Sequence, residues 1–174
     1  MTTVRLETPD DAEVLAALHV RAWQRVYAGI LPDDLLATLN PEVRAQRRRE
    51  ALANADGPFT SMVAEHEGSL AGFVTFGPYR VGQDMTNLDH EFGEILAIYV
   101  DPDRWGGGVG GALMRTALQR LEQPEVRLWV LADNKQAQGF YRKHGLSPDG
   151  VTGLFRPRGT ELEYPETRFA IVRR

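Results

Sequence analysis

The chain of 174 residues contains no cysteine, and this absence excludes disulfides, thiolate nucleophiles and cysteine-ligated metal sites. It also has no apolar run near the roughly 18 residues that a membrane-spanning helix requires. Its first residues lack the basic-then-apolar order of a secretory signal peptide. We therefore expect a soluble, cytoplasmic protein without a membrane partner.

An excess of positive charge is missing as well. Lys and Arg together number 20 against 24 Asp and Glu, which gives a net charge of −4 at pH 7. Proteins that bind nucleic acids usually carry a basic field that neutralises phosphates, so the composition argues against a nucleic-acid partner. No repeat, low-complexity tract or like-charge block divides the sequence. Residues 1–174 are therefore expected to form a single domain.

Local patterns in the first half predict a strand, two helices and a hairpin. Residues 2–7 alternate as a short strand, and apolar residues at three- and four-residue steps make residues 8–27 helical. A second helical region follows at residues 41–53. Two strands, 59–65 and 70–76, flank turn residues and form the hairpin. The polar segment that follows, up to residue 93, lacks periodicity and is longer than an ordinary hairpin connection, which indicates a mobile or functional loop.

The second half contains a strand–turn–helix–strand unit. Residues 94–100 are a dense apolar and β-branched run, typical of a buried strand. A glycine-rich turn at residues 105–111 leads into a helix over 112–121, and residues 126–131 form another buried strand. Such a unit places its two strands parallel, with a right-handed crossover. Asn134 then caps a further helix, and two or three shorter strands complete the chain.

The glycine-rich turn is the strongest chemical signal. Five of the six positions from 106 to 111 are glycine. Without side chains, the backbone N–H groups can converge on a ligand, and the following helix adds its unpaired N–H groups and positive dipole end. The turn therefore favours an anion, most of all a phosphate or pyrophosphate, over a tight turn without a ligand.

Two phosphate-binding motifs compete for this turn. A Walker loop needs Gly-Lys-Ser/Thr, which is absent. Gly106-x-Gly108-x-x-Gly111 matches the dinucleotide fingerprint, with Asp133 at the end of the next strand. Only 63 residues follow Gly111, too few for the usual two-halved dinucleotide sheet. A nicotinamide- or flavin-nucleotide oxidoreductase thus stays open as an alternative.

Two neighbouring blocks carry a family resemblance. The sequence from Ile98 to Met114, IYVDPDRWGGGVGGALM, resembles motif A of the GNAT superfamily of N-acetyltransferases. The pattern Asn134-x-x-Ala137-x-x-Phe140-Tyr141-x-x-x-Gly145-Leu146 is similar to motif B. Together they cover about 50 contiguous residues, and residues 22–32 resemble the N-terminal helices of some members more weakly. Where the family pattern has a polar and a basic residue in the loop, this chain has Trp105 and Gly107.

This resemblance implies an α/β (α+β) fold, namely a central mixed sheet with splayed parallel strands, flanked by about four helices. It implies acetyl-CoA as the cofactor, with its pantetheine arm beside strand 94–100 and its pyrophosphate on the glycine turn. Asn134 would contact the cofactor arm or simply cap its helix. The cofactor-binding residues that the resemblance implies are Ile98, Tyr99, Val100, Arg104, Trp105, Gly106, Gly107, Gly108, Val109, Gly110, Gly111, Asn134 and Tyr141.

The implied reaction is N-acetylation of a primary amine by direct attack in a ternary complex, with Glu94 and Tyr141 as the catalytic residues. Glu94 opens the buried strand, where a carboxylate would take the amine proton directly or through water; otherwise it is an exposed strand-end acid. Tyr141, at the position of the motif B tyrosine, would protonate the departing thiolate; otherwise it packs beside Phe140. A non-catalytic module that binds acyl-CoA is the competing function.

The acceptor is expected to be a small-molecule or peptide amine, and the resemblance implies a homodimer as an oligomeric state to test. His90 lies between two acids, but adjacent residues cannot easily face one ion, so no metal site is predicted. An aromatic row at helical spacing either lines an acceptor pocket, together with the loop over residues 80–93, or packs into the core. The candidate substrate-binding residues are His19, Trp23, Tyr27 and Tyr79.

Overall fold

The computed structural model describes residues 1–174 and contains one seven-stranded mixed sheet, in the order β1-β2-β3-β4-β5-β7-β6. The strands are β1 (Thr2–Leu6), β2 (Thr60–His66), β3 (Ser69–Arg80), β4 (Leu88–Val100), β5 (Glu125–Leu131), β6 (Ser147–Phe155) and β7 (Tyr164–Val172). The helices are α1 (Ala12–Val26), α2 (Asp33–Ala37), α3 (Pro41–Ala53), α4 (Val109–Arg120) and α5 (Lys135–Lys143). Three short 3-10 turns are η1 (Pro9–Asp11), η2 (Val81–Gln83) and η3 (Pro102–Arg104).

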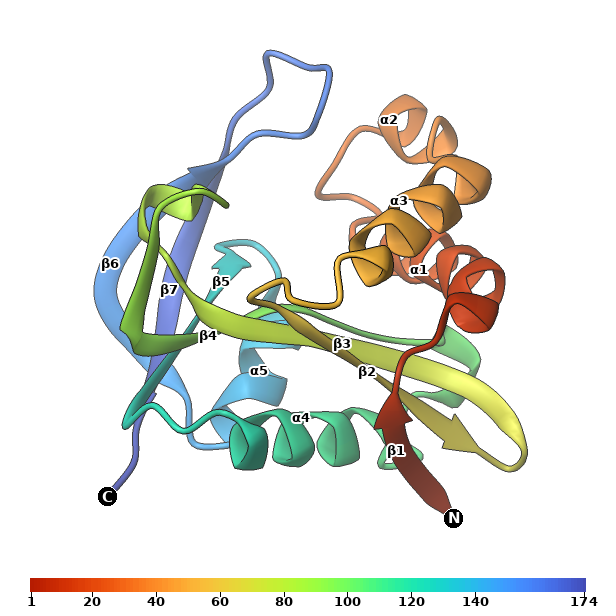
Figure 1. Cartoon of the computed structure of the whole chain (residues 1–174). Helices are drawn as coiled ribbons and strands as arrows, with labels where there is room; N and C mark the ends of the chain where they lie inside the picture. The colour runs from red at the N-terminus through yellow and green to blue at the C-terminus, as the bar shows by residue number, and fades with distance from the viewer.

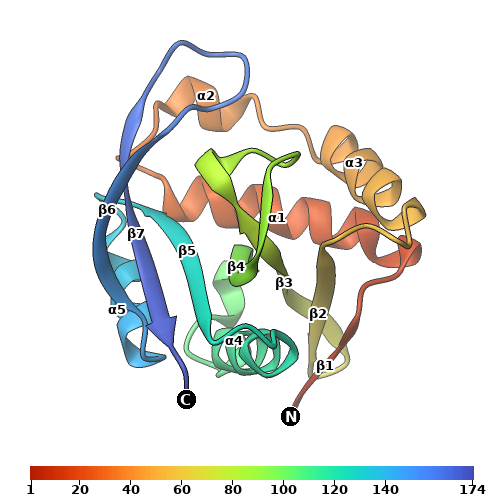
Figure 2. The ribbon, with the colours of Figure 1, turned by 60° about the vertical axis from the view of Figure 1, so that its left-hand side comes forward.

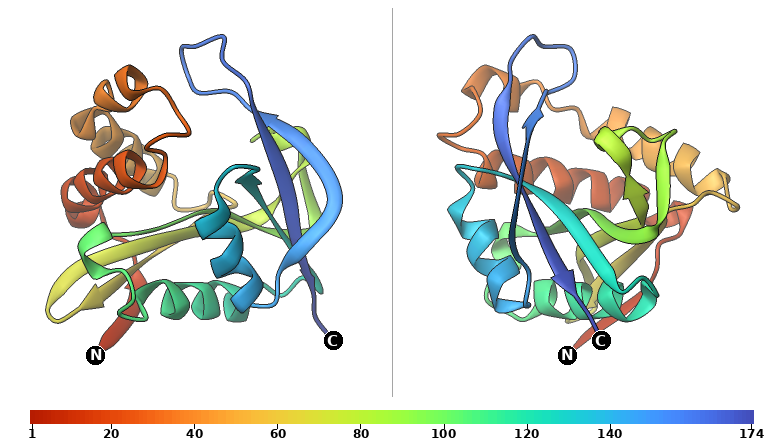
Figure 3. Two further views of the ribbon diagram at one scale, coloured as in Figure 1. Left: turned by 180° about the vertical axis from the view of Figure 1, so that it is seen from behind. Right: turned by 90° about the vertical axis from the view of Figure 1, so that its left-hand side faces the viewer.

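Helices cover both faces of the twisted sheet (Figure 1). Helix α4 runs along one face with α5 beside it, while α1, α2 and α3 gather on the other. Figure 3 shows the connection between β6 and β7 rising toward α2, above the sheet. None of the helices is both long and apolar enough to span a bilayer. The expected mixed sheet is confirmed, with five helices rather than about four, because the sequence pattern did not predict the short α2.

The main core lies between the sheet and helix α4. A stripe of apolar residues at helical spacing, Val109, Leu113, Ala117 and Leu121, is buried there, as an amphipathic helix on a sheet requires. It packs against apolar residues of β3, β4 and β5 and against Phe169 of β7. The stripe therefore fixes the position of α4, and with it the glycine turn that opens this helix.

The central strands β4 and β5 are parallel, as the strand–turn–helix–strand unit predicted, but they stay together only briefly. Their pairing consists of Gly93 with Val126 and Glu94 with Arg127. Beyond Glu94, β4 continues for six residues paired only with β3, while β5 pairs with β7. The two strands diverge from this point (Figure 2), so the edge of β4 that faces β5 carries no backbone ladder from Ile95 onward.

The expected loop over residues 80–93 was wrong. Strands β3 and β4 extend through this segment as a hairpin that η2 closes, with Tyr79 opposite Asp89 and Arg80 opposite Leu88. The register shifts between Pro78 and Tyr79. Such a bulge interrupts the alternation of side chains between the two faces, which explains why the polar sequence showed no period of two.

A buried ion pair joins the N-terminal segment to α3. Glu7 accepts two hydrogen bonds of 2.7 Å from Arg48, and the Glu7 side chain is only 2% exposed. The Arg48 guanidinium also lies 4.0 Å from the ring centroid of Phe73. Removing one partner of such a pair leaves the other charge buried without compensation.

We expect Glu7→Ala to lower the free energy of unfolding by about 3 kcal/mol, because Arg48 then loses its buried partner. The matched control is Glu13→Ala, which removes the exposed partner of Arg49 and should change stability by less than about 0.5 kcal/mol. Urea unfolding of both variants measures the difference. Equal losses would contradict the assignment of Glu7 as a buried structural charge.

Candidate active site

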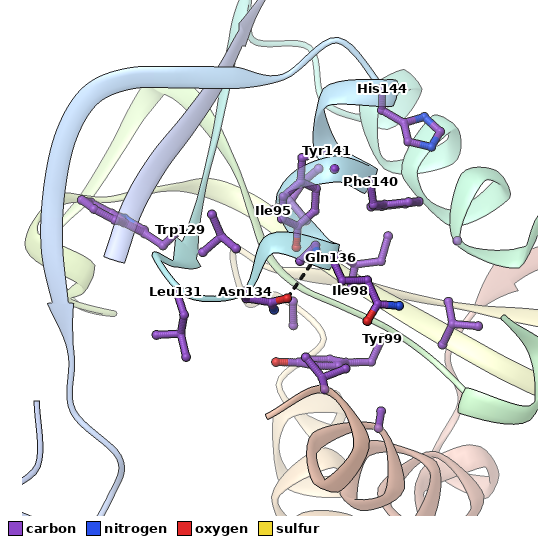
Figure 4. A pocket seen from close by; sticks show the side chains of 18 of the residues that line it. Ile95, Ile98, Tyr99, Trp129, Leu131, Asn134, Gln136, Phe140, Tyr141 and His144 are labelled. Atoms are coloured by element: carbon purple, nitrogen blue, oxygen red, sulfur yellow. Dashed lines mark hydrogen bonds between the residues drawn. The ribbon is translucent and has the colours of Figure 1, made fainter. Parts of the chain in front are cut away.

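One cavity of about 1020 Å³ occupies the gap between the diverging strands. Its walls come from α1, β4, the glycine turn with the start of α4, the end of β5, and α5, with single residues from β3, η2, η3, β6 and β7. The view in Figure 4 shows Trp129 and Leu131 on one side, Phe140 and His144 on another, and Tyr99 across from α5. The cavity therefore joins the glycine turn to the junction of β4, β5 and β7.

The glycine turn presents bare backbone to this cavity. Gly106 and Gly108 both have φ of +81°, and a Cβ atom at either position would meet nothing within 4 Å. The first intrahelical hydrogen bond of α4 runs from Ala112 N–H to the Gly108 carbonyl. The amides of residues 109–111 thus precede the helical ladder, and their donors belong to the helix end that attracts anions.

Basic side chains also line this cavity. The lining includes Arg104, Arg115, Lys135, Lys143 and His144. Burial, and then the nearby Arg115, lower the pKa of His144 and favour its neutral form. Arg115 lies beside Gly111 at the start of α4, whereas Arg104 is paired with Glu67 and Lys135 Nζ donates to the carbonyl of Ala132. Unpaired amides and the nearby Arg115 give this end of the cavity the electrostatics of an anion site.

Trp105 and Gly107, the two departures from the family pattern, each make a hydrogen bond that stabilises the turn. Trp105 Nε1 donates a hydrogen bond of 3.1 Å to the carbonyl of Val100, which ties the turn to the end of β4. Gly107 lies outside the cavity lining, with its N–H bonded to the Arg104 carbonyl at 3.3 Å. The other residues predicted to bind the cofactor line the cavity together.

Asn134 is a buried N-cap and also lines the cavity. Its Oδ1 accepts a hydrogen bond of 3.1 Å from Ala137 N–H, drawn as the dashed line in Figure 4. Its Nδ2 has no hydrogen-bond partner in the chain. The cap is thus shown by the geometry, and the amide nitrogen is a donor that a ligand can use.

Tyr141 projects from α5 with its hydroxyl toward the interior of the cavity, in the direction of Asn134 and Tyr99 (Figure 4). Its ring packs against Phe140 and Phe169, so the aromatic body is fixed while the oxygen lacks a partner in the chain. Burial, and then the proximity of Tyr99, raise the pKa of Tyr141 well above its ordinary value. The phenol is therefore protonated at neutral pH.

Glu94 is the last residue of β4 that pairs with β5, and its side chain is 1% exposed. Arg80 surrounds its carboxylate: Oε1 accepts 2.7 Å from Arg80 Nη2, while Oε2 accepts 3.1 Å from Nε and 2.9 Å from the backbone N–H. The alternative of an exposed strand-end acid is therefore wrong. Both oxygens are already used within the chain.

A second carboxylate, Glu166 of β7, lines the cavity near this ion pair. Glu166 lies opposite Leu131 of β5 and Gly153 of β6 in the sheet, and the residue is 6% exposed. Its Oε2 accepts a hydrogen bond of 2.7 Å from Gln83 Nε2. Burial, and then the charge of Glu94, raise the pKa of Glu166, while Gln83 and Arg80 oppose that rise.

Aromatic side chains line the wall that α1 contributes. His19, Trp23 and Tyr27 all line the cavity, and Phe155 of β6 faces Trp23 edge-on with ring centroids 6.1 Å apart. The hydroxyls of Tyr27 and Tyr99 are 3.0 Å apart. Tyr79, the fourth predicted substrate residue, lies outside the lining; it is buried and accepts a hydrogen bond of 3.0 Å from Arg168.

Several lining residues were missed by the sequence analysis. Arg115 lies one helical turn after Gly111 on α4, so helical spacing alone gave a signal for it. Arg80 and Gln83 belong to the segment 80–93, which was expected beside the acceptor pocket but without roles for single residues. The others carry no local signal, because they come from β5, β6 and β7 and meet only through sheet topology. These are Trp129, Phe155 and Glu166.

Comparison with known proteins identifies the class. Residues 20–146 match the family model described as Acetyltransferase (GNAT) family. A probable N-acetyltransferase of Mycobacterium tuberculosis is 28% identical over 88% of this chain and 84% of its own length. An uncharacterized N-acetyltransferase of Bacillus subtilis is 32% identical over 87% of this chain and 82% of its own length.

The fold is also that of solved acetyltransferase structures. PaiA N-acetyltransferase from Thermoplasma acidophilum, solved in complex with coenzyme A, superposes with a TM-score of 0.74 at 17% identity, over 96% of this chain and 98% of that one. The chain belongs to the GNAT family of acetyltransferases. It is an acyltransferase, and the cofactor of its family is acetyl-CoA.

The residues present fit this cofactor. A diphosphate requires N–H donors and positive charge, and the amides at the start of α4 and the Arg115 side chain beside Gly111 supply both at one end of the cavity. A Cβ atom at Gly110 would lie 3.1 Å from Phe140 Cε2, so glycine is needed there for α5 to pack against the turn.

We expect Asn134→Ala to lower the free energy of unfolding by about 1 kcal/mol, because α5 loses its side-chain cap. Asn134→Asp keeps an oxygen at the same place and should retain near wild-type stability. Thermal unfolding of the pair provides the measurement. Equal destabilisation by both substitutions would contradict the capping role.

Proposed function

We propose that this protein transfers the acetyl group of acetyl-CoA to a primary amine, with both substrates bound in one cavity. The observation that carries the proposal is the continuity of that cavity. It joins the N–H donors of the glycine turn to the Tyr141 hydroxyl and to the carboxylates at the junction of β4, β5 and β7. Direct attack needs the donor and the acceptor in contact, and one continuous space allows this.

In this proposal the pyrophosphate lies on the amides of residues 109–111 and beside Arg104 and Arg115. The pantetheine arm would lie along Ile98–Val100, on the edge of β4 that has no paired strand. The free backbone groups of this edge can hydrogen-bond to an amide of the arm, as they would to an added strand. Asn134 Nδ2 is a further donor on the opposite wall. When bound, the cofactor supplies an acetyl thioester, whose carbonyl carbon is the electrophile.

Tyr141 is the proposed proton donor to sulfur. A thiol has a pKa of about 8.5 and an ordinary phenol about 10, so a protonated phenol can stabilise or protonate a departing thiolate. The raised pKa of Tyr141 keeps its proton available throughout the neutral range. The packed ring fixes the oxygen, which limits the reorganisation needed during the transfer.

The amine must lose a proton before it can attack. An alkylammonium resembling lysine has a pKa of about 10.4, so its free-base form at pH 7 costs roughly 4–5 kcal/mol. The sequence-based proposal gives this proton to Glu94, directly or through water. Arg80 donates hydrogen bonds to both Glu94 oxygens. Glu94 therefore also holds the Arg80 side chain in place and balances its charge.

The acceptor is proposed to be a small-molecule or peptide amine whose body contacts the aromatic wall of His19, Trp23 and Tyr27. Burial, and then the neighbouring Arg44 and Arg48, lower the pKa of His19 well below its ordinary value. The side chains of His19, Trp23 and Tyr27 are therefore uncharged at pH 7, and the Arg44 guanidinium contacts them, 4.8 Å from the ring centroid of Trp23. The aromatic rings of this wall can pack against an apolar group, or an ammonium can lie over a ring face in a cation–π contact.

The proposed function is tested by measuring free thiol released from acetyl-CoA across a panel of primary amines, with thiol release in buffer alone as the baseline. We expect amine-dependent release for at least one class of amine, and acetylated product by mass spectrometry. Tight binding of CoA by calorimetry without release for any amine would instead support a non-catalytic acyl-CoA module.

We expect Tyr141→Phe to lower kcat by about 100-fold at saturating acetyl-CoA, because the sulfur then loses its proton donor. The dissociation constant of CoA should stay within about twofold, since the ring remains. Tyr164→Phe is the matched control, because Tyr164 is half-buried outside the cavity lining. Unchanged kcat in Tyr141→Phe would remove the phenol from the reaction.

A further inference from the structure

The two buried carboxylates at the β4–β5–β7 junction differ in what their oxygens contact. Glu94 has three hydrogen bonds from Arg80 and almost no exposed side-chain surface. Glu166 has one, from Gln83 to Oε2. Its Oε1 has no partner in the chain and is not sealed from the cavity. Glu94 also lines the cavity, but donors from Arg80 contact both of its oxygens, so Glu166 Oε1 is the carboxylate oxygen at this junction that has no donor in the chain.

The balance of charges at the junction also points to Glu166 as the residue that contacts the acceptor. Arg80 balances Glu94 within their ion pair, so Glu166 leaves one negative charge in excess. Gln83 is neutral, and the strand neighbours Leu131 and Gly153 are uncharged. A single buried negative charge at the end of an otherwise aromatic wall favours a monocationic ligand group.

The backbone and packing around Gln83 hold the Glu166 carboxylate in a fixed position. Gln83 adopts φ of +60°, uncommon for a residue other than glycine, at the tip of the β3–β4 hairpin. A Cβ atom at Gly153 would lie 3.0 Å from Trp129 and 3.7 Å from Gln83 Nε2. Glycine on β6 thus leaves the space in which Gln83 and Trp129 lie beside Glu166.

We infer that Glu166 is the residue that contacts the acceptor ammonium and takes its proton, and that Glu94 is a positioning residue that holds Arg80. The inference rests on the proposed function. In this step an N–H bond of the ammonium breaks and a bond from hydrogen to Glu166 Oε1 forms, which leaves the lone pair on nitrogen. The proton returns to solvent after product release, and the second amine proton replaces the one that Tyr141 gives to sulfur.

Three titratable groups from other elements face Glu166, and they set the sign of its response to pH. Arg80 of β3 favours the charged carboxylate, Glu94 of β4 disfavours it, and Tyr27 of α1 is uncharged because burial raises its pKa well above the ordinary value. Replacing Glu94 with Gln removes the repulsion and frees Arg80, so the pKa of Glu166 should fall. Replacing Gln83 with Met removes a donor to the carboxylate, so that pKa should rise.

The experiment compares kcat/KM against pH for the wild type, Glu166→Gln, Glu94→Gln and Gln83→Met. We expect Glu166→Gln to lose at least about 100-fold in kcat/KM at pH 7 and to lose the acid limb of the profile. Glu94→Gln should retain an acid limb at lower pH, and Gln83→Met should show it at higher pH. Glu161→Gln, at an exposed position between β6 and β7, controls for the loss of one negative charge.

The opposite pattern would overturn the inference. If Glu94→Gln abolishes the acid limb while Glu166→Gln keeps it, Glu94 is the proton acceptor. A second readout needs no turnover: the ¹³C carboxyl resonance of Glu166 should titrate above the ordinary glutamate pKa of about 4.3, and higher still in Gln83→Met. An ordinary or lower value contradicts the inference, whereas an absence of acetyl transfer to any amine contradicts the proposed function instead.

Discussion

The divergence of β4 and β5 is the constraint on which the rest of the site depends. Two residue pairs join these strands, and then each strand keeps a single neighbour. A continuous sheet would bury its central backbone groups in ladders and leave no space for a ligand. Here one edge of β4 is unpaired inside the molecule, which is costly unless something hydrogen-bonds to it. A ligand with its own amides satisfies that edge.

Helix packing keeps the divergent strands in place. The buried stripe of α4 holds this helix under β3 and β4, and α5 packs Phe140 and Tyr141 against the same core. The glycine turn lies between them, with Gly110 against the Phe140 ring. The N–H donors at the start of α4 and the hydroxyl of Tyr141 are therefore positioned by the hydrophobic core rather than by mobile loops, which suits a site that must hold two substrates in register.

The sequence was sufficient for features that depend on local order. The β-branched run of β4, the glycine turn, the helix that follows it and the Asn134 cap all involve neighbours a few residues apart, and each was confirmed. The β3–β4 hairpin was missed because a bulge interrupts its alternation, and α2 because it is only five residues long. The burial of Glu94 beneath Arg80 could not be predicted from the sequence either, because this ion pair depends on the register of β3 and β4. Glu166 in the segment Tyr-Pro-Glu-Thr-Arg carries no local signal and acquires its surroundings only from β5, β6 and the distant Gln83.

The most direct test of the central claim is a crystal structure of the protein with CoA bound. We expect electron density for the diphosphate on the amides of residues 109–111, and for the pantetheine arm along β4 between the diverging strands, with sulfur near the Tyr141 hydroxyl. Density for CoA elsewhere on the surface, with the gap between β4 and β5 filled by side chains, would contradict it.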